Sequence, residues 1–410
     1  MSTPLISVLM AAYNAARYLD SAVASVLSQV YTDWELIAVD DGSADETWPL
    51  LAAWATRDAR IRIFRNDRND GVGTTRARCL DLARGEYSAV MDSDDVALPS
   101  WLAQRVALLD RRRDVVLASG PLQAIGERDE DLGSRPGKGS PVVLKWRLLF
   151  GNPIHDPSAV FRTSAARQVG GYQSQPYMPD WSLGARLSEV GQVVQEGAPQ
   201  MKYRIHPEST SARLGPDKGR LESVAHHIMA RNLDFHTHIE LPERLAWYLF
   251  RGRFPFRGEP IVSRAALRVL CEAYTKFIAV HGGTPGSAQL PAAFLDDVAN
   301  VLRTGGWTFR TLCEMVSVAF RPFFPRAALH PACLKSAAKG YLLPLTAKYR
   351  LRATAETTSS GKAGAAVADE KEGAASTTPE VAGGSRAFPG NASGSPHAMA
   401  QPYRMKYRVR

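Results

Sequence analysis

The chain has 410 residues, of which 45% are hydrophobic and 22% charged, so it is long enough for two domains and has an ordinary globular composition. Its four cysteines show no CxxC spacing, which argues against a disulfide scaffold or a structural zinc site and suits a reducing compartment. No apolar run reaches the roughly 18 residues of a membrane span, and no charged segment precedes the first apolar run as in a signal peptide. We therefore expect a cytoplasmic protein.

The net charge of +9 is unevenly distributed along the chain. Residues 1–214 hold 24 Lys and Arg against 26 Asp and Glu, whereas residues 215–350 hold 18 against 10. This basic excess suits peripheral contact with anionic lipid at the inner face of the membrane, and a solvated basic helical surface explains it equally well. No recognition motif for nucleic acid accompanies it, so we expect no nucleic-acid partner.

Short apolar runs alternate with helical patterns over the first 120 residues. Ser43 and Glu46 predict a capping box for a helix after the second apolar run. Strand–helix alternation of this kind predicts a mostly parallel sheet with helices on both faces, in which ligands bind beyond the carboxyl ends of the strands. The predicted strands cover 6–11, 34–39, 61–64 and 87–91, and the other predicted helices cover 17–29, 71–83 and 99–109.

The remainder of the chain divides by composition. Residues 125–140 predict a polar loop, after which ordered patterns resume and complete a first domain over 1–214. Residues 215–352 predict a mainly helical region, with Pro and Gly breaks near 255–260 and 282–286. From 353 to 410 the composition shifts to Ala, Gly, Ser, Thr and Pro, which cannot bury enough apolar surface to fold, so we predict a disordered tail.

The stretch VMDSDDVALP places Asp92, Asp94 and Asp95 directly after the fourth predicted strand. Like charges at this spacing raise one another's pKa unless a cation lies among them. On an extended strand Asp92 and Asp94 point to the same side, where two carboxylates can hold Mg²⁺ or Mn²⁺ and leave coordination positions open for a diphosphate. The alternative is that Asp94 or Asp95 caps the helix that follows.

Several stretches, in this order, resemble family-2 glycosyltransferases of the GT-A fold. ISVLMAAYNAARYLDSAVASVLSQVYTDWELIAVDDGSADET resembles the opening of that family, RARCLDLARGEYSAVMDSDDVALP its second block, and HDPSAVFR, GGY, PDWSLGARL and YRIH its acceptor half. The resemblance covers about residues 4–214, and it implies a nucleotide-binding half over 1–120 and an acceptor half over 121–214. It implies an inverting hexosyltransferase that moves a sugar from a nucleotide-diphosphate donor to a hydroxyl of a glycan or lipid-linked acceptor, as in cell-surface polysaccharide synthesis.

Carried onto this sequence, the resemblance assigns roles to single residues. Asp41 would accept a hydrogen bond from a uracil ring, with Asp40 beside it as support, so a UDP-sugar donor is favoured. Asp92 would face the ribose and the metal, and Asp94 would be the firmest ligand of Mn²⁺ or Mg²⁺. The nucleotide-sugar site implied in this way comprises Ala12, Tyr13, Asp40, Asp41, Arg76, Asp92 and Ser93.

The acceptor half supplies two further residues. His206 in YRIHPES matches a position that approaches the metal and diphosphate, and a surface histidine before a proline is the alternative. Asp180 matches the base that takes the proton of the acceptor hydroxyl, and it also suits a helix N-cap ahead of WSLGARL. The chain departs from the family where Pro179 replaces an acidic residue and where Ala77, not Asn, follows Arg76. The first departure bears on acceptor specificity and the second on the nucleotide pocket.

Two other functions compete with sugar transfer. A non-catalytic protein that binds sugar nucleotides or glycans on the same scaffold is the main alternative; loss of Asp92, Asp94 or Asp180 would favour it, and all three are present. A sugar nucleotidyltransferase would need a glycine-rich phosphate loop near the N-terminus, and AAYNAARYL has no glycine.

The basic helical region holds two weaker signals. His226, His227, His236 and His238 have no cysteine or acidic cluster to complete a metal shell, so zinc is disfavoured. The stretch WYLFRGRFPFRG, residues 247–258, predicts packing against the first domain, with contact to a membrane or a lipid-linked acceptor as the alternative.

Overall fold

The computed structural model describes residues 6–209, 218–250 and 260–303. By its internal contacts the chain divides into two units, residues 1–330 and residues 331–410. All described residues belong to the first unit. The predicted disordered tail lies outside the described residues, so it stays a prediction, as does the domain boundary at residue 214.

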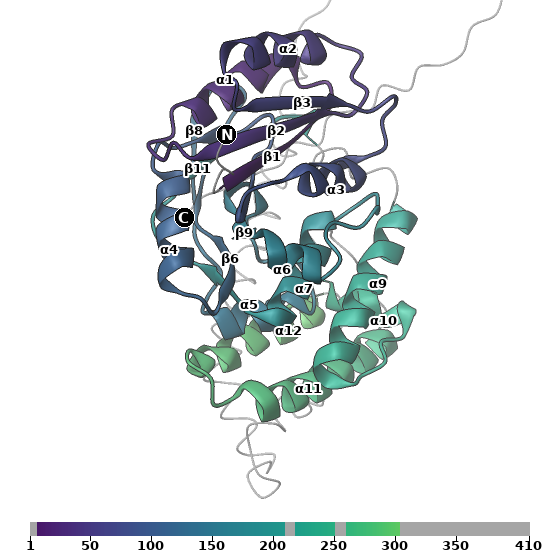
Figure 1. The fold of residues 1–410 in the computed structure, drawn as a ribbon. Coiled ribbons are helices and arrows are strands. Elements are labelled where there is room, and N and C mark those ends of the chain that lie inside the picture. The colour runs from purple at the N-terminus through teal and green to yellow at the C-terminus, as the bar shows by residue number, and fades with distance from the viewer. Residues whose placement is uncertain (1–5, 210–217, 251–259, 304–410) are drawn as a thin grey trace, which may run out of the picture. The chain divides into compact units, whose positions relative to one another are not determined.

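A seven-stranded sheet forms the centre of the first unit (Figure 1). It is built from β1 (Ile6–Ala12), β2 (Trp34–Asp40), β3 (Ile61–Arg65), β4 (Tyr87–Val90), β6 (Val115–Ser119), β9 (Val160–Arg162) and β10 (Gln192–Gln195). The spatial order is β10-β6-β9-β4-β1-β2-β3, and only β9 runs antiparallel to its neighbours. The chain leaves β3 at one edge and returns beside β1 as β4. The strand order therefore reverses between β1 and β4, which is where ligands bind in such sheets.

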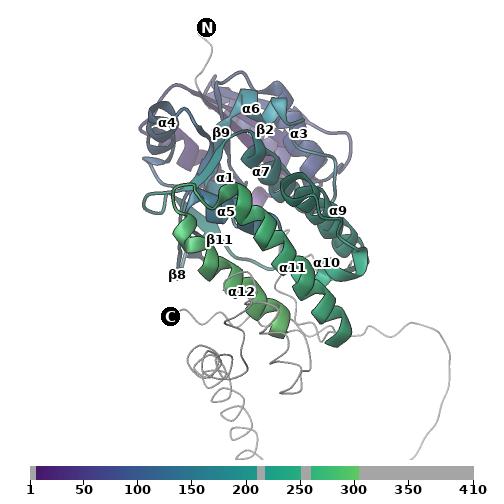
Figure 2. The same cartoon turned by 90° about the horizontal axis from the view of Figure 1, so that it is seen from below.

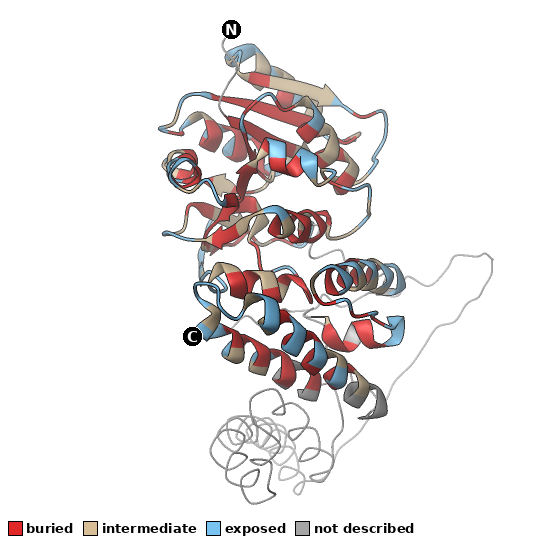
Figure 3. Ribbon diagram, turned by 60° about the horizontal axis from the view of Figure 1, so that its bottom comes forward, coloured by how far each residue is buried: buried red, intermediate tan, exposed pale blue. Residues whose placement is uncertain are grey.

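Helices cover both faces of this sheet. Alternate residues of β1 separate two cores, because successive side chains of a strand point to opposite faces. Val8 packs in the core that contains α1 (Ala16–Leu27) and α4 (Trp101–Arg111), and Leu9 packs in the core that contains α3 (Val72–Leu82). Figure 3 shows that the central strands are buried along most of their length. The predicted mostly parallel sheet with helices on both faces is thus confirmed, with helices α1 (Ala16–Leu27), α2 (Thr47–Arg57), α3 (Val72–Leu82) and α4 (Trp101–Arg111).

The start of α2 differs from the prediction. The helix begins at Thr47, and the hydroxyl of Ser43 accepts the backbone N–H of Asn14 at 2.9 Å. Asp45 Oδ1 instead accepts the backbone N–H of Thr47 at 3.0 Å. The predicted capping box of Ser43 and Glu46 is therefore wrong, because the serine joins two loops rather than capping the helix.

A smaller sheet connects distant parts of the chain. It has the order β5-β11-β7-β8, formed by β5 (Val96–Ala97), β7 (Leu122–Ile125), β8 (Asp131–Arg135) and β11 (Met201–Arg204). The predicted polar loop over 125–140 is wrong in part, because β8 pairs antiparallel with β7 inside it. Strand β8 is a mostly exposed edge strand, so its sequence is as polar as a loop. The antiparallel pair of β5 and β11 brings the segment after β4 beside the segment after β11.

The helical region packs against the first 209 residues through one continuous core (Figure 2). Trp146 lies at its centre, edge-on to Tyr274 and Phe277 at ring distances of 5.5 and 5.3 Å. Its indole N–H donates to Asp297 at 2.9 Å. The predicted helical character is confirmed for the described part of this region. The helices involved are α5 (Pro141–Leu148), α6 (Thr163–Gln168), α7 (Pro179–Val190), α9 (Lys218–Thr237), α10 (Glu243–Leu249), α11 (Pro260–His281) and α12 (Leu290–Arg303).

The aromatic and basic stretch over 247–258 is described only at its start. There Leu249 is buried, and the ring of Phe250 stacks on Trp181 of α7 at 5.6 Å. The described part therefore packs, as the sequence predicts, and residues 251–258 lie outside the described residues. Within the described ranges, no helix has both the length and the apolar composition that a membrane span requires.

Candidate active site

Two loops join at the carboxyl ends of β1 and β2. The backbone N–H of Asp41 donates to the carbonyl of Ala12 at 2.8 Å. The side-chain oxygen of Asn14 accepts the backbone N–H of Ala44 at 2.9 Å, and Asn14 adopts a left-handed φ of 48° to make this contact. Ala12 is buried, whereas the side chain of Tyr13 is 42% exposed at the edge of the sheet. The loops thus form a fixed wall with one projecting aromatic ring.

Asp40 and Asp41 are both buried, but their partners differ. Asp40 forms an ion pair with Arg65 at 2.9 Å. Asp41 accepts hydrogen bonds from Asn66 Nδ2 at 2.7 Å and from the backbone N–H groups of residues 70–71, each at 2.9 Å, just before α3. A carboxylate accepts about four hydrogen bonds, so Asp41 keeps capacity for about one more.

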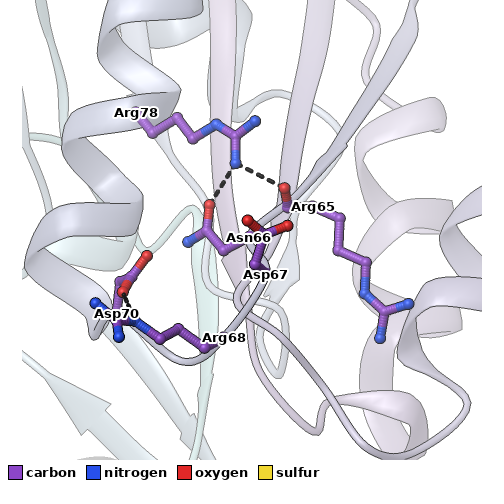
Figure 4. A pocket seen from close by; sticks show the side chains of 6 residues that line it. All are labelled: Arg65, Asn66, Asp67, Arg68, Asp70 and Arg78. Carbon is purple, nitrogen blue, oxygen red and sulfur yellow. Dashed lines mark hydrogen bonds and ion pairs between the residues drawn. The ribbon is translucent and has the colours of Figure 1, made fainter.

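A cavity of 510 Å³ lies at the end of β3 (Figure 4). Its cations have nearby acceptors: Arg65 pairs with Asp40, Arg68 pairs with Asp70 at 3.1 Å, and Arg78 donates to the carbonyl of Arg65 at 2.7 Å. Strand β3 is three strands from β4, or roughly 14 Å across the sheet. The cavity therefore borders the Asp41 loop and lies away from the acidic segment after β4. Its lining residues are Arg65, Asn66, Asp67, Arg68, Asp70 and Arg78.

The carboxylates of Asp92, Asp94 and Asp95 converge directly after β4. One oxygen from each lies within 4.8 Å of the others. Asp95 is fully buried, and its Oδ1 accepts the backbone N–H of Arg204 at 2.8 Å. Helix α4 begins only at Trp101 and has no side-chain cap, so the alternative that Asp94 or Asp95 caps it is wrong.

His206 lies against this cluster because β11 ends beside it. Its Nε2 contacts Asp94 Oδ2 at 2.8 Å, and its ring packs edge-on against Tyr18 at 5.0 Å. The histidine is 9% exposed, so the alternative of a surface histidine is wrong. Its role as a metal ligand stays a prediction.

These residues fit a hard divalent cation. Burial, together with the charges of the neighbouring carboxylates, raises the pKa of Asp95 well above its ordinary value and raises the pKa of Asp92. Among the described residues, Asp95 Oδ2 is buried and has no hydrogen-bond partner. Carboxylate oxygens are the ligands that Mg²⁺ and Mn²⁺ prefer, and a cation would remove the repulsion among them. Ser93 lies half-buried within the same turn.

Arg76 of α3 links this cluster to a residue to which the sequence assigned no role. Its guanidinium contacts Asp92 Oδ1 at 2.5 Å and Asp156 Oδ2 at 2.7 Å. Asp156 precedes β9, the neighbour of β4, so its position at this edge follows from the antiparallel pairing of the two strands. Burial raises the pKa of Asp156 to about 7, with the charges of Asp180 and Asp92 acting in the same direction and Arg76 opposing them.

Asp180 is the second residue of α7. One of its oxygens accepts the side-chain N–H of Asn152 at 2.6 Å. Met178, in a left-handed conformation, precedes the helix as its cap residue, so the alternative that Asp180 is the N-cap is wrong. The charge of Asp180 raises the pKa of both Asp92 and Asp156, which places it in the same electrostatic neighbourhood.

The histidines of the helical region form no comparable centre. His226 Nε2 contacts the carbonyl of Leu241 at 2.9 Å, and the ring of His236 packs against Phe277. Across the described residues, the aspartate cluster after β4 is the only group of three or more potential metal-ligating side chains. The expectation that these histidines hold no zinc stays a prediction.

Comparison with known proteins identifies the family. The family model described as glycosyl transferase family 2 matches residues 7–169. A glycosyltransferase of Haemophilus influenzae, itself uncharacterized, is 31% identical over 219 residues, which cover 51% of this chain and 68% of that protein. The chain belongs to glycosyl transferase family 2. The predicted resemblance to this family is thereby confirmed.

A second relative in sequence and a solved structure are also similar to this family-2 glycosyltransferase. EpsE of Bacillus subtilis is 33% identical over 196 residues, which cover 46% of this chain and 69% of EpsE. A crystal structure of TarS from S. aureus in complex with UDP-GlcNAc superposes with a TM-score of 0.48 at 14% identity. That superposition covers 80% of this chain and 88% of the TarS chain.

Sequence reasoning missed some residues of this site. The motif HDPSAVFR pointed to the segment that holds Asp156, but nothing in one sequence indicates that this carboxylate meets Arg76. Arg204 lies inside the YRIH motif, but nothing in one sequence indicates that its backbone N–H binds Asp95, which is 109 residues away. Tyr172 of the GGY motif is buried beside Arg76, with the guanidinium carbon 6.0 Å from the ring centre.

Proposed function

We propose that this family-2 glycosyltransferase transfers a sugar, with inversion, from a UDP-sugar to a hydroxyl of a glycan or lipid-linked acceptor in polysaccharide synthesis. One observation carries the proposal. Three carboxylates that can hold a divalent cation lie together, and the carboxylate of Asp180 is close enough for its charge to raise the pKa of one of them, Asp92. A cation site for a diphosphate beside a general base is what transfer from a nucleotide sugar needs.

The donor side of the proposal rests on the loops after β1 and β2. Asp41 has room for about one more hydrogen bond, and an imide N–H such as that of uracil would donate it. Ala12 and Tyr13 would border the base, with the exposed Tyr13 ring available for stacking. Asp40, neutralised by Arg65, would support the loop rather than contact the base.

The chemistry assigns distinct work to the two ends of the site. Asp92, Asp94 and His206 would hold Mn²⁺ or Mg²⁺, which when bound would stabilise the charge on the departing diphosphate. Asp180 would take the proton of the acceptor hydroxyl as its oxygen attacks the anomeric carbon and the bond to UDP breaks. Asn152 holds one oxygen of Asp180, which leaves the other oxygen for the acceptor. Attack in one step, without a covalent intermediate, inverts the configuration at that carbon.

A non-catalytic protein that binds sugar nucleotides is the alternative function. Such a protein would need the donor loops and the cation site, and it would have no use for a base on the acceptor side. The presence of Asp180 near Asp92 and Asp156 therefore favours the enzyme.

The test is a donor-hydrolysis screen. Purified protein is incubated with Mn²⁺ or Mg²⁺ and a panel of UDP-, GDP- and TDP-sugars, and the released nucleotide is measured. We expect release from one or more UDP-sugars, loss of release in EDTA, and loss in Asp94→Ala. Release from GDP-sugars alone would contradict the donor assignment, and release that persists in EDTA would contradict the cation site.

A further inference from the structure

Arg76 occupies the position between the cation site and Asp156. One nitrogen of its guanidinium contacts Asp92 at 2.5 Å, and the other contacts Asp156 at 2.7 Å. The side chains of Arg76 and Asp156 are only 10% and 12% exposed, so water screens their charges little. The ring of Tyr172 closes one side of this pair. Asp92, Arg76 and Asp156 thus form a chain of two ion pairs in a mostly buried environment.

This pattern poses an electrostatic problem for a cation. Asp92 would have to bind a divalent ion while one of its oxygens accepts a hydrogen bond from a permanently charged guanidinium. A positive charge so close to the ion would oppose its binding strongly in a buried site. The carboxylate of Asp156, on the far side of the same guanidinium, removes most of that opposition because the net charge of Arg76 and Asp156 together is zero.

We propose that Asp156 is a positioning residue whose charge offsets Arg76, so that Asp92 can hold both Arg76 and a divalent cation. The inference rests on the proposed cation site and adds a residue outside it. Arg76 fixes Asp92 through Oδ1 and leaves Oδ2 for the ion, and Asp156 keeps Arg76 in place without a net positive charge.

The experiment is a calorimetric titration of Mn²⁺ alone into the full-length chain at pH 8, where a carboxyl with a pKa of about 7 is ionised. Wild type is compared with Asp156→Asn and with the double variant Asp156→Asn/Arg76→Gln. We expect Asp156→Asn to weaken Mn²⁺ binding at least about tenfold, because the charge of Arg76 is then unopposed. The double variant should return to within about threefold of wild type, because the net charge of the pair is again zero.

Glu35→Gln is the matched control. Glu35 is also a buried carboxylate paired with an arginine, since its Oε2 contacts Arg62 at 2.7 Å. It lies near the start of β2, at the opposite end of the sheet from Asp92. Its substitution removes the same charge at a distance from the cation site, so Mn²⁺ affinity should not change.

The outcomes distinguish a failure of this inference from a failure of the proposed cation site. Mn²⁺ binding that is lost in Asp94→Ala but unaffected by Asp156→Asn overturns the inference alone. A double variant that binds Mn²⁺ more weakly than Asp156→Asn also overturns it. The pair would then contribute to Mn²⁺ binding by holding the local structure in place and not by its charge. A wild-type chain that binds no Mn²⁺ overturns both. If Asp156→Asn does not fold, Arg76→Gln decides alone: binding at least as tight as wild type supports the inference, and weaker binding overturns it.

Discussion

A few side chains determine the charge balance at the carboxyl edge of the large sheet. Asp92, Asp94 and Asp95 converge within 4.8 Å, and Asp156 and Asp180 add charge beside them. Burial, and after it the charges of neighbouring carboxylates, raise the pKa of Asp92, Asp95 and Asp156. A bound cation would lower these pKa values, because it favours the ionised form of a carboxylate.

The role of Asp180 can be separated from donor binding. Asp180→Asn keeps the size of the side chain but cannot take a proton, so sugar transfer should fall by about 10² to 10⁴. UDP affinity should be kept, because the proposal assigns UDP binding to Asp41, Asp92 and Asp94. The measurement is transfer rate beside calorimetric UDP affinity, with Asp180→Asn compared with wild type. Unchanged transfer would remove the catalytic role, and an equal loss of UDP affinity would assign Asp180 to the donor site.

The titration of Asp156 predicts a pH dependence of stability. A carboxyl with a higher pKa in the folded protein than in the unfolded chain takes up a proton on folding. Its contribution to stability is therefore present below its ordinary pKa of 3.8 and is lost as the pH rises through about 7. In EDTA, Asp156→Asn should gain stability relative to wild type between pH 5 and pH 8, by about 3 kcal/mol. Urea unfolding at the two pH values measures this; a pH-independent difference would show that Asp156 does not titrate in this range.

At the scale of elements, the pattern of apolar residues was sufficient to predict the strands that are buried along their whole length. The predicted strands over 6–11 and 34–39 match β1 and β2 closely, because both are buried on both faces. Strand β8 could not be predicted, because an exposed edge strand has no apolar alternation. The capping box failed because the contact that Ser43 makes is tertiary, with Asn14.

The residues of the candidate site also divide into those that the sequence predicted and those that it did not. The DxD segment and Asp180 could be located from local motifs, whereas Asp156 and Arg204 reach the site through pairing between distant strands. A single sequence does not indicate which distant strands pair. The positions of these side chains at the strand ends and helix start were therefore predictable, and their contacts with distant segments were not.

Trp146 joins helix α5 to α11 and α12, so its removal should affect the packing of the whole helical region. Trp146→Ala should lower the free energy of unfolding by about 3 to 5 kcal/mol, the usual cost of deleting a buried aromatic ring. Trp54→Ala, which removes a partly exposed tryptophan on α2, should cost much less. Urea unfolding measures both. Equal losses would show that α5 does not anchor the helical region.

At the scale of the whole molecule, charge and composition change along the chain. The basic excess lies in residues 215–350, which follow the acidic segment along the chain. This division suits a polyanionic or lipid-linked acceptor held near a membrane surface, which remains a prediction of the composition.

The tail over 353–410 should be dispensable for folding and donor hydrolysis. Its composition supplies too little apolar surface to share a core. Truncation after residue 352 should leave the melting temperature and the rate of UDP-sugar hydrolysis unchanged. A truncated chain that unfolds at lower temperature would show that the tail packs on the rest of the protein.

The most direct test of the central claim is a calorimetric titration of UDP in Mn²⁺ and in EDTA. If the turn after β4 holds a cation that binds the diphosphate, UDP should bind in Mn²⁺ and bind at least about tenfold more weakly in EDTA. Asp94→Ala should show the weaker affinity in both solutions while melting at the wild-type temperature. Equal UDP affinity in Mn²⁺ and EDTA, or in wild type and Asp94→Ala, would contradict the cation-dependent donor site.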